Sequence, residues 1–260
     1  MTNIRSFLGA AGVAAVAALG MSTAALAADD SADKFGYSIT ISGTSDYIFR
    51  GISLTQSDPA FQPFIEFTYG NPNLTWYFDL WGSNIHTGSR AFQPWELDMY
   101  AGVRPVTGPI SWDLGVLYYT YPSAPVRGGD YVEFKVAATI TPITNLTLTA
   151  IGFATPDQGN NSPLTETGEL DVAYTLPAYG AFTPTLSGAV GYTNSERAGW
   201  FSGADNYTYW NAGLKVTVDK YFMDFRYWDT SISRSDTVAG GADYSTVDSR
   251  FVFTAGVNLP

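Results

Sequence analysis

Segments of about ten residues with apolar side chains at every second position recur along this chain, and they constrain its fold more than any other feature. In one of them, Trp95, Leu97 and Met99 alternate with Glu96 and Asp98. A period of two places successive side chains on opposite faces of a β-strand. Twelve such segments are predicted, near residues 36–50, 60–70, 73–83, 94–104, 109–121, 130–141, 145–154, 168–176, 182–193, 207–218, 220–229 and 247–259. The chain is therefore predicted to be all-β.

The connections between these segments alternate strictly between long and short. The short ones are 70–73, 105–108, 141–144, 177–181 and 219–220. The long ones are 51–59, 84–93, 122–129, 155–167, 194–206 and 230–246. Short periplasmic turns and longer external loops are the layout of an outer-membrane barrel. The pattern predicts an antiparallel up-and-down barrel of about twelve strands with both termini in the periplasm.

The composition favours a barrel in lipid over a soluble one. Charged residues make up 14% of the chain and aromatic residues 15%, whereas ordinary soluble domains have about 25% charged residues. A soluble periplasmic barrel would need polar outer faces, which these segments lack. After residue 27, no stretch has the length of a transmembrane helix. Because lipid leaves unpaired backbone groups unsatisfied, a strand protein in a membrane must be a closed barrel.

The first 27 residues have the three parts of a secretory signal peptide. Arg5 provides the positive start, residues 7–21 form a short apolar run, and residues 25–27 have the small-x-small form of a cleavage site. We expect residues 1–27 to be the signal peptide and 28–260 to be one barrel domain. Outer-membrane lipid and the outer-membrane assembly machinery are then expected partners.

Charge and residue counts exclude several classes of function. The chain has 13 Lys and Arg against 24 Asp and Glu, and removal of Arg5 leaves a net charge of −12. This acidity argues against nucleic acid as a partner, because phosphates need basic partners. With no cysteine and a single histidine, His86, thiolate and multi-histidine metal sites are excluded. No cofactor is expected.

One stretch, SDYIFRGISLTQSDPAFQ from Ser45 to Gln62, continues the alternation of its strand through Tyr47 and Phe49. The pattern predicts a strand that runs to Arg50, with both rings on the lipid face. Asp46 and Arg50 are roughly 13 Å apart at 3.3 Å per residue, too far to pair with each other. Each is expected to pair across strands, with residues such as Glu66, while Gly51 permits a bend.

The same stretch carries a family resemblance. It is similar to the N-terminal signature of the TorF family, also known as the Gcw_chp family of bacterial outer-membrane proteins, at Ser45, Asp46, Tyr47, Phe49, Arg50, Gly51, Ser53, Thr55, Pro59, Ala60 and Gln62. ELDMYAG at 96–102 and YTYP at 119–122 resemble two further family blocks. The resemblance implies an outer-membrane β-barrel with a pore role.

Aromatic residues near the ends of the segments are expected to form the two girdles of a membrane barrel. Beside the short connections these are Tyr69, Trp76, Trp112, Tyr174, Phe182 and Tyr221. Beside the long ones they are Phe49, Phe61, Trp95, Tyr118, Tyr131, Tyr192 and Tyr227.

Charged residues opposite the apolar stripes are predicted to line the lumen, because charge is costly on a lipid face. They are Asp46, Arg50, Glu66, Asp79, Glu96, Asp98, Arg104, Asp113, Glu133, Lys135, Glu169, Asp171, Lys215, Asp224, Arg226 and Arg250. Carboxylates outnumber bases, so a lumen that favours cations or neutral solutes is expected. The alternative is a salt-bridge network that fills the barrel, since twelve strands lie between filled and open barrels.

Three functions remain open. A porin-like channel would pass small polar solutes or ions. A plugged barrel would act as a surface binding protein or adhesin through the loops 194–206 and 230–246. A lipid hydrolase would need His86 as its base, beside Ser83, Ser89 and Glu96, although nothing resembles a nucleophile elbow. We expect a channel, and no catalytic residue.

Overall fold

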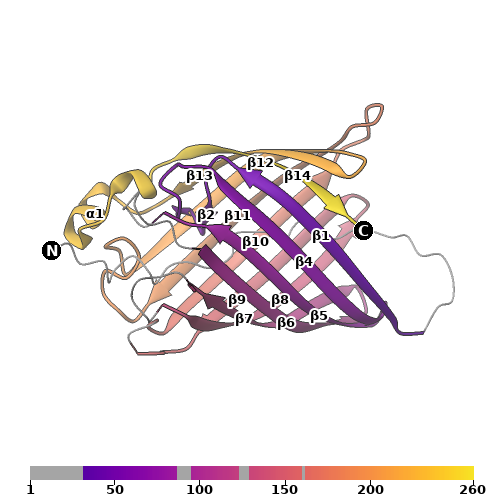
Figure 1. The fold of residues 1–260 in the computed structure, drawn as a ribbon, viewed down its shortest axis with the longest axis horizontal. Coiled ribbons are helices and arrows are strands. Elements are labelled where there is room, and N and C mark those ends of the chain that lie inside the picture. The colour runs from indigo at the N-terminus through magenta and orange to yellow at the C-terminus, as the bar shows by residue number, and fades with distance from the viewer. Residues whose placement is uncertain (1–31, 87–94, 123–128, 160–161) are drawn as a thin grey trace.

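The computed structural model describes residues 32–86, 95–122, 129–159 and 162–260. The predicted signal peptide lies outside these residues. Twelve of the strands form one closed antiparallel barrel (Figure 1), in the order β1-β14-β13-β12-β11-β10-β9-β8-β7-β6-β5-β4. They are β1 Lys34–Thr44, β4 Ala60–Asn71, β5 Leu74–Asn84, β6 Trp95–Thr107, β7 Ile110–Thr120, β8 Tyr131–Ile143, β9 Leu146–Thr155, β10 Thr165–Thr175, β11 Thr183–Ser195, β12 Asn206–Val218, β13 Tyr221–Thr230 and β14 Arg250–Leu259.

The barrel closes through β1, which pairs with β4 on one side and β14 on the other. Ile39, for example, lies opposite both Ile65 and Leu259. Closure pairs the backbone groups of every barrel strand, which is the requirement for crossing lipid. The predicted fold class, an antiparallel β-barrel of about twelve strands, is therefore confirmed.

Alternation along the strands produces two faces of different chemistry. On β6, Trp95 and Leu97 are 42% and 41% exposed, whereas Glu96 and Asp98 between them are fully buried. Exposed apolar side chains continue around the outer face on β1, β4, β5, β7, β8 and β10 to β14. An apolar outer band flanked by aromatic rings is what lipid requires. Among the described residues, no helix has the length and apolar character needed to span a membrane.

The predicted aromatic girdles are largely confirmed on the outer face. At the turn end, Tyr69, Trp76 and Tyr221 are exposed, and Phe61 and Tyr192 are exposed at the opposite end. Two members were placed wrongly. Phe49 and Tyr131 are buried inside the barrel, because Tyr131 shares the face of Glu133 on β8 and Phe49 leaves the barrel wall altogether.

The connections sort to the two ends of the barrel as predicted. Tight turns join the strands at one end, here called the turn end, and residues with positive φ make them possible, as at Asn145 and Asp219. The longer connections lie at the other end, here called the loop end, to the left in Figure 1.

A folded cap covers part of the loop end. It contains the helix α1 (Arg234–Gly240) and the 3-10 turn η2 (Tyr244–Thr246). Ser233 begins α1 with a capping box, and its hydrogen bonds to Asp236 hold the pKa of that carboxyl below its ordinary value. Gly203 lies against the backbone of α1 at Asp236 and Gly240, where a Cβ would not fit. The connections before β12 and after β13 are therefore packed together.

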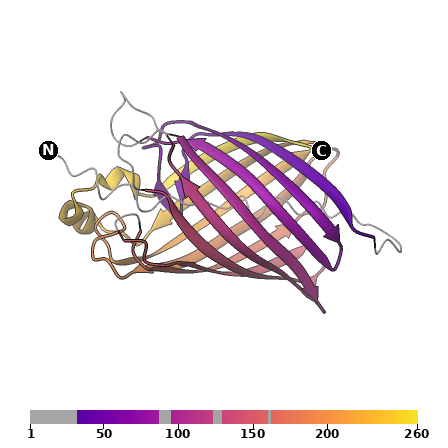
Figure 2. The same ribbon diagram turned by 60° about the horizontal axis from the view of Figure 1, so that its bottom comes forward.

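The first strand departs from the prediction. β1 ends at Thr44, six residues earlier than expected. The chain then forms a small separate sheet, of β2 (Ile48–Phe49) and β3 (Ile52–Ser53). Period two does not specify which sheet a strand joins, so the alternation continued across this break without revealing it. We call residues 45–58 the inner hairpin (Figure 2).

Candidate functional site

The inner hairpin turns at Arg50 and Gly51. Their φ angles are +45° and +83°, and Phe49 pairs with Ile52 across them. Two successive residues with positive φ are the pattern of a type I′ hairpin turn, which normally has glycine or asparagine at its first position. Arginine is unfavourable in this conformation, so the tip must be held by its contacts.

Asp46 clamps the base of the inner hairpin. Its carboxylate accepts hydrogen bonds from the hydroxyls of Ser53 (2.6 Å) and Thr55 (2.7 Å). Arg250, at the start of β14, bonds the same carboxylate at 2.7 Å and also donates to the Ser57 hydroxyl at 3.1 Å. The clamp joins both arms of the hairpin to the barrel wall and explains three positions of the motif.

The two faces of the hairpin pack against opposite parts of the barrel. Tyr47 and Phe49 belong to one buried cluster, which is completed by Trp81, Tyr100, Leu117, Tyr119 and other side chains of β4 to β8. Ile48 and Ile52 belong to a second cluster, which includes Tyr207, Tyr209, Trp228, Val252 and cap residues. The hairpin therefore crosses the lumen. In Figure 1, β2 lies inside the barrel outline near the loop end.

Arg50, at the tip of the inner hairpin, contacts the barrel wall at β8. Its guanidinium makes a bidentate pair with Glu133, at 2.9 and 3.1 Å, and both side chains are buried. The rings of Phe49 and Phe153 lie on it, with centroids 4.6 and 4.5 Å away. Bidentate geometry and flanking rings are the strong forms of arginine contact.

Side chains of the barrel wall also hold Glu133, the partner of Arg50, in place. Tyr119 and Thr155 each donate a hydrogen bond to Glu133 at 3.0 Å. On the far side of the tip, Gly51 lies against Thr230 and Tyr209, and a Cβ there would clash with both. The predicted bend at Gly51 is confirmed, with close packing as a further reason for glycine. The predicted partner Glu66 is wrong, because it lies nearer the turn end and pairs with Arg104.

A charged network lines the wall of β4 to β8 toward the turn end. Arg104 pairs with Glu66 at 2.6 Å, and Lys135 pairs with Asp113 at 2.9 Å. Arg104 also approaches Asp113 at 3.7 Å, which joins the two pairs. Tyr77 donates to Asp113 at 2.8 Å. These side chains share the face of Glu133 and point away from lipid.

A second network lies across the barrel on β10 to β13. Arg226 pairs with Asp224 at 2.9 Å and donates to Asn211 and Ser187. On the same part of the wall, Tyr209 donates to Glu169 at 2.6 Å. The remaining members are Lys215, whose ammonium lies 4.5 Å from the ring centroid of Phe222, and Asp171.

All sixteen charged residues singled out from the sequence therefore alternate with lipid-facing residues or lie on the inner hairpin. The structure brings the six bases into contact with acidic or aromatic partners. Among the described residues, a buried carboxylate oxygen without any hydrogen-bond partner occurs at Asp79, Glu96, Asp98 and Asp171.

Glycines let several inward rings lie flat against the wall. Tyr77 covers Gly102 and Gly115, where an added Cβ would collide with its hydroxyl, and Arg104 lies over the ring at 4.1 Å. Tyr209 covers Gly191, and Phe222 covers Gly256, in the same way. A ring held along the wall leaves more of the cross-section free than one that projects into it.

Replacement of Gly115 by valine is expected to lift Tyr77 from the wall and to separate its hydroxyl from Asp113. The clash and the lost hydrogen bond should lower the free energy of unfolding by about 1–3 kcal/mol. Urea unfolding of the folded barrel in lipid measures this. Gly152→Val is the control, since a Cβ at Gly152 meets no atom within 4 Å; equal losses for both would contradict the packing explanation.

His86 makes no hydrogen bond to Ser83, one of the two serines considered for hydrolysis from the sequence. It is buried, and its Nδ1 lies 3.1 Å from Asp58 Oδ2 without hydrogen-bond geometry. Ser83 donates to the carbonyl of Asn84 and accepts from Gln62. Ser89 lies outside the described residues. Within the described part of the chain, Ser83 therefore has other hydrogen-bond partners, and no hydrogen bond joins it to His86.

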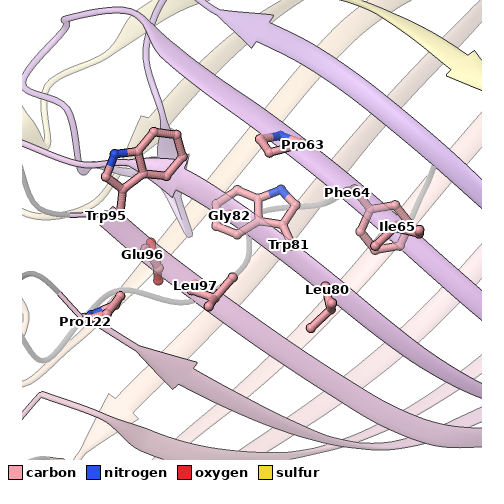
Figure 3. Close-up of a pocket in the computed structure, with 10 residues that line it drawn as sticks. All are labelled: Pro63, Phe64, Ile65, Leu80, Trp81, Gly82, Trp95, Glu96, Leu97 and Pro122. Carbon is pink, nitrogen blue, oxygen red and sulfur yellow. The ribbon is translucent and has the colours of Figure 1, made fainter.

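A shallow apolar pocket of about 370 Å³ lies on the outer wall over β4, β5 and β6 (Figure 3). Pro63, Leu80, Gly82, Trp95 and Leu97 are among its lining residues. These belong to the outer, lipid-facing positions, and Gly82 leaves the depression because it has no side chain. The pocket is therefore a depression in the apolar outer wall.

Sequence reasoning missed the aromatic residues that hold the inner hairpin. Along β9 the apolar residues change phase, from Leu146 and Leu148 to Ile151 and Phe153. Ile151 and Phe153 point inward, where Phe153 contacts Arg50. Tyr47 and Phe49 were assigned to lipid for the opposite reason: their phase was right for a strand they do not join. The break in phase at Phe153 was the available signal that the interior there is apolar.

Comparisons with known proteins identify a family and a fold. A family described as "Bacterial protein of unknown function (Gcw_chp)" matches residues 27–257. This covers the Gcw_chp part of the resemblance, whereas the name TorF stays a prediction. No curated protein matches the sequence.

Similar solved structures include two porins. The KdgM porin has a TM-score of 0.50 at 7% identity, over 86% of this chain and 98% of that chain. The NanC porin has a TM-score of 0.50 at 11% identity, over 85% and 99%. A protein from a study of in-meso crystallization of membrane proteins has a TM-score of 0.53 at 11% identity, over 86% and 83%. At such identities the likeness shows the fold alone.

Proposed function

The chain belongs to the Gcw_chp family of bacterial proteins of unknown function, and we propose that it is an outer-membrane channel for passive diffusion of small polar solutes or ions. The observation that carries this proposal is the set of ten carboxylates and six bases that lie on the inner face of the wall or on the inner hairpin, away from lipid. Fixed charge on that face is costly to keep unless water or solute shares the lumen. The porin-like fold agrees with this role.

The inner hairpin sets the narrowest part of this channel. It crosses the lumen near the loop end and attaches to β8 through Arg50 and Glu133. Solutes pass beside the hairpin, so the passage takes small molecules. The proposed function needs no cofactor and no covalent chemistry.

Selectivity follows from the balance of fixed charge. Carboxylates exceed bases in the lumen set, ten to six. Acidic side chains that line a lumen attract cations and repel anions. The channel is therefore proposed to favour cations or neutral solutes. The loop end faces the cell exterior in this proposal, with both termini in the periplasm.

A second candidate function is favoured by the same hairpin. If the hairpin fills the lumen, the protein is a plugged barrel that binds a partner through its loop end, where α1 and η2 form the cap. The two functions differ in conductance, because a plugged barrel carries no current.

Single-channel recording of the purified barrel in a planar bilayer tests the proposal. We expect discrete ohmic steps and, under a potassium chloride gradient, a reversal potential of the sign that indicates cation preference. Folding is checked by the heat-dependent mobility of the barrel on gels. A folded barrel that stays electrically silent would overturn the channel and leave the plugged barrel.

A further inference from the structure

Glu96 and Asp98 lie side by side on the inner face of β6. Two residues apart on one strand face, their Cα atoms are roughly 7 Å from each other. One oxygen of each carboxylate is held by a tyrosine: Tyr121 donates to Glu96 at 3.0 Å, and Tyr100 donates to Asp98 at 2.6 Å. The other oxygens, Glu96 Oε2 and Asp98 Oδ1, are buried without a partner. Both side chains are fully inaccessible.

No base in the described part of the chain neutralises this pair. Its ion pairs include neither Glu96 nor Asp98. Arg50, the base in this region of the barrel, directs both terminal nitrogens to Glu133. Two buried carboxylates without counter-charge are strongly unfavourable. A positive partner that is not a side chain would remove that cost.

The surroundings of the pair are aromatic. Tyr47 and Trp81 contact each other with centroids 5.2 Å apart, and Tyr119 and Tyr131 stack at 4.5 Å. All belong to the cluster that holds one face of the inner hairpin. The Tyr47 hydroxyl lies beside Glu96, but it is a third buried polar atom there that lacks good hydrogen-bond geometry. Carboxylate oxygens combined with ring faces are the chemistry that recognises ammonium-type cations.

We propose that Glu96 and Asp98, with the aromatic side chains around them, form a binding site for a small monovalent ammonium-type cation, such as ammonium or methylammonium. Divalent metal ions are a poorer match, because the described residues contain no group of three or more carboxylate, histidine or cysteine ligands. The site deepens the proposed function by naming a solute class, but equilibrium binding to it does not depend on conduction.

Isothermal titration of methylammonium chloride into the barrel purified from outer membranes tests the site, with sodium chloride at equal ionic strength as the competing salt. We expect saturable binding of one ion per chain, about tenfold tighter than for sodium, because ring faces favour organic cations. Glu96→Gln and Asp98→Asn should each abolish it. Glu196→Gln, in an exposed loop, is the matched control and should bind as the native chain does.

Each result decides the proposal. Binding that survives in both variants, or no saturable binding in the native barrel, would overturn it. If a variant fails to fold, the native barrel decides through its infrared carboxylate bands, which should shift with the midpoint of the titration. Unchanged bands would overturn the site. A conducting barrel without this binding refutes the site alone, whereas a silent barrel that binds methylammonium refutes the channel alone.

Discussion

Removal of the inner hairpin is expected to raise the single-channel conductance at least severalfold. In this variant, residues 47–54 are replaced by a short glycine and serine linker. The barrel should still close, because β1 pairs with β4 from Lys34 to Thr44 and with β14 from Ile39 onward, without any contribution from the hairpin. The widened cross-section at the loop end then determines the current, which planar-bilayer recording measures.

The matched control places the same linker at residues 177–181, in a connection at the turn end. That variant alters a loop of the barrel without touching the lumen crossing, so its conductance should equal that of the native protein. If the hairpin variant folds and conducts no better than the native chain, the hairpin does not limit the passage.

The second large effect concerns stability. Replacement of Glu133 by glutamine, or of Arg50 by methionine, is expected to lower the free energy of unfolding by about 3–5 kcal/mol, because each leaves the other buried charge without its partner. The double variant Arg50→Met with Glu133→Leu should lose much less, since no buried charge remains. Urea unfolding of the barrel in lipid, followed by tryptophan fluorescence, measures all three.

A second ion pair in the same lumen provides the control for this cycle. Arg104 and Glu66 are 36% and 17% exposed, against 7% and 2% for Arg50 and Glu133. Screening by water makes such a pair worth about 1 kcal/mol or less, so Glu66→Gln should be mild. Equal losses at the two sites would show that burial does not distinguish them.

The local alternation of apolar and polar residues was sufficient to predict the strands of the barrel wall. Each of the twelve predicted segments overlaps a barrel strand, and most of their ends differ by only a few residues. The reason is physical: a strand between lipid and a polar lumen must alternate at every step, so one short segment records both environments. The same alternation predicted which charged side chains point away from lipid, as Glu96 and Asp98 do on β6.

At the inner hairpin, alternation was not sufficient to predict the structure. Tyr47 and Phe49 follow the phase of β1, yet they pack inside the barrel against residues of β5 to β8. Alternation specifies that two sides of a strand differ, but it does not specify which sheet the strand joins or what lies on its apolar side. A buried aromatic cluster and a lipid surface both select the same residues.

The amino-acid sequence by itself determined the strand order along the chain, the two faces of the wall and the closed barrel, because each depends on near neighbours and on the solvent they meet. Only the tertiary structure decided that Arg50 crosses the lumen to Glu133, 83 residues away. It likewise decided that Glu96 and Asp98 each have a buried carboxylate oxygen without a good hydrogen bond, beside an aromatic cluster. Such contacts join distant strands across the lumen, and barrel closure alone brings those strands together.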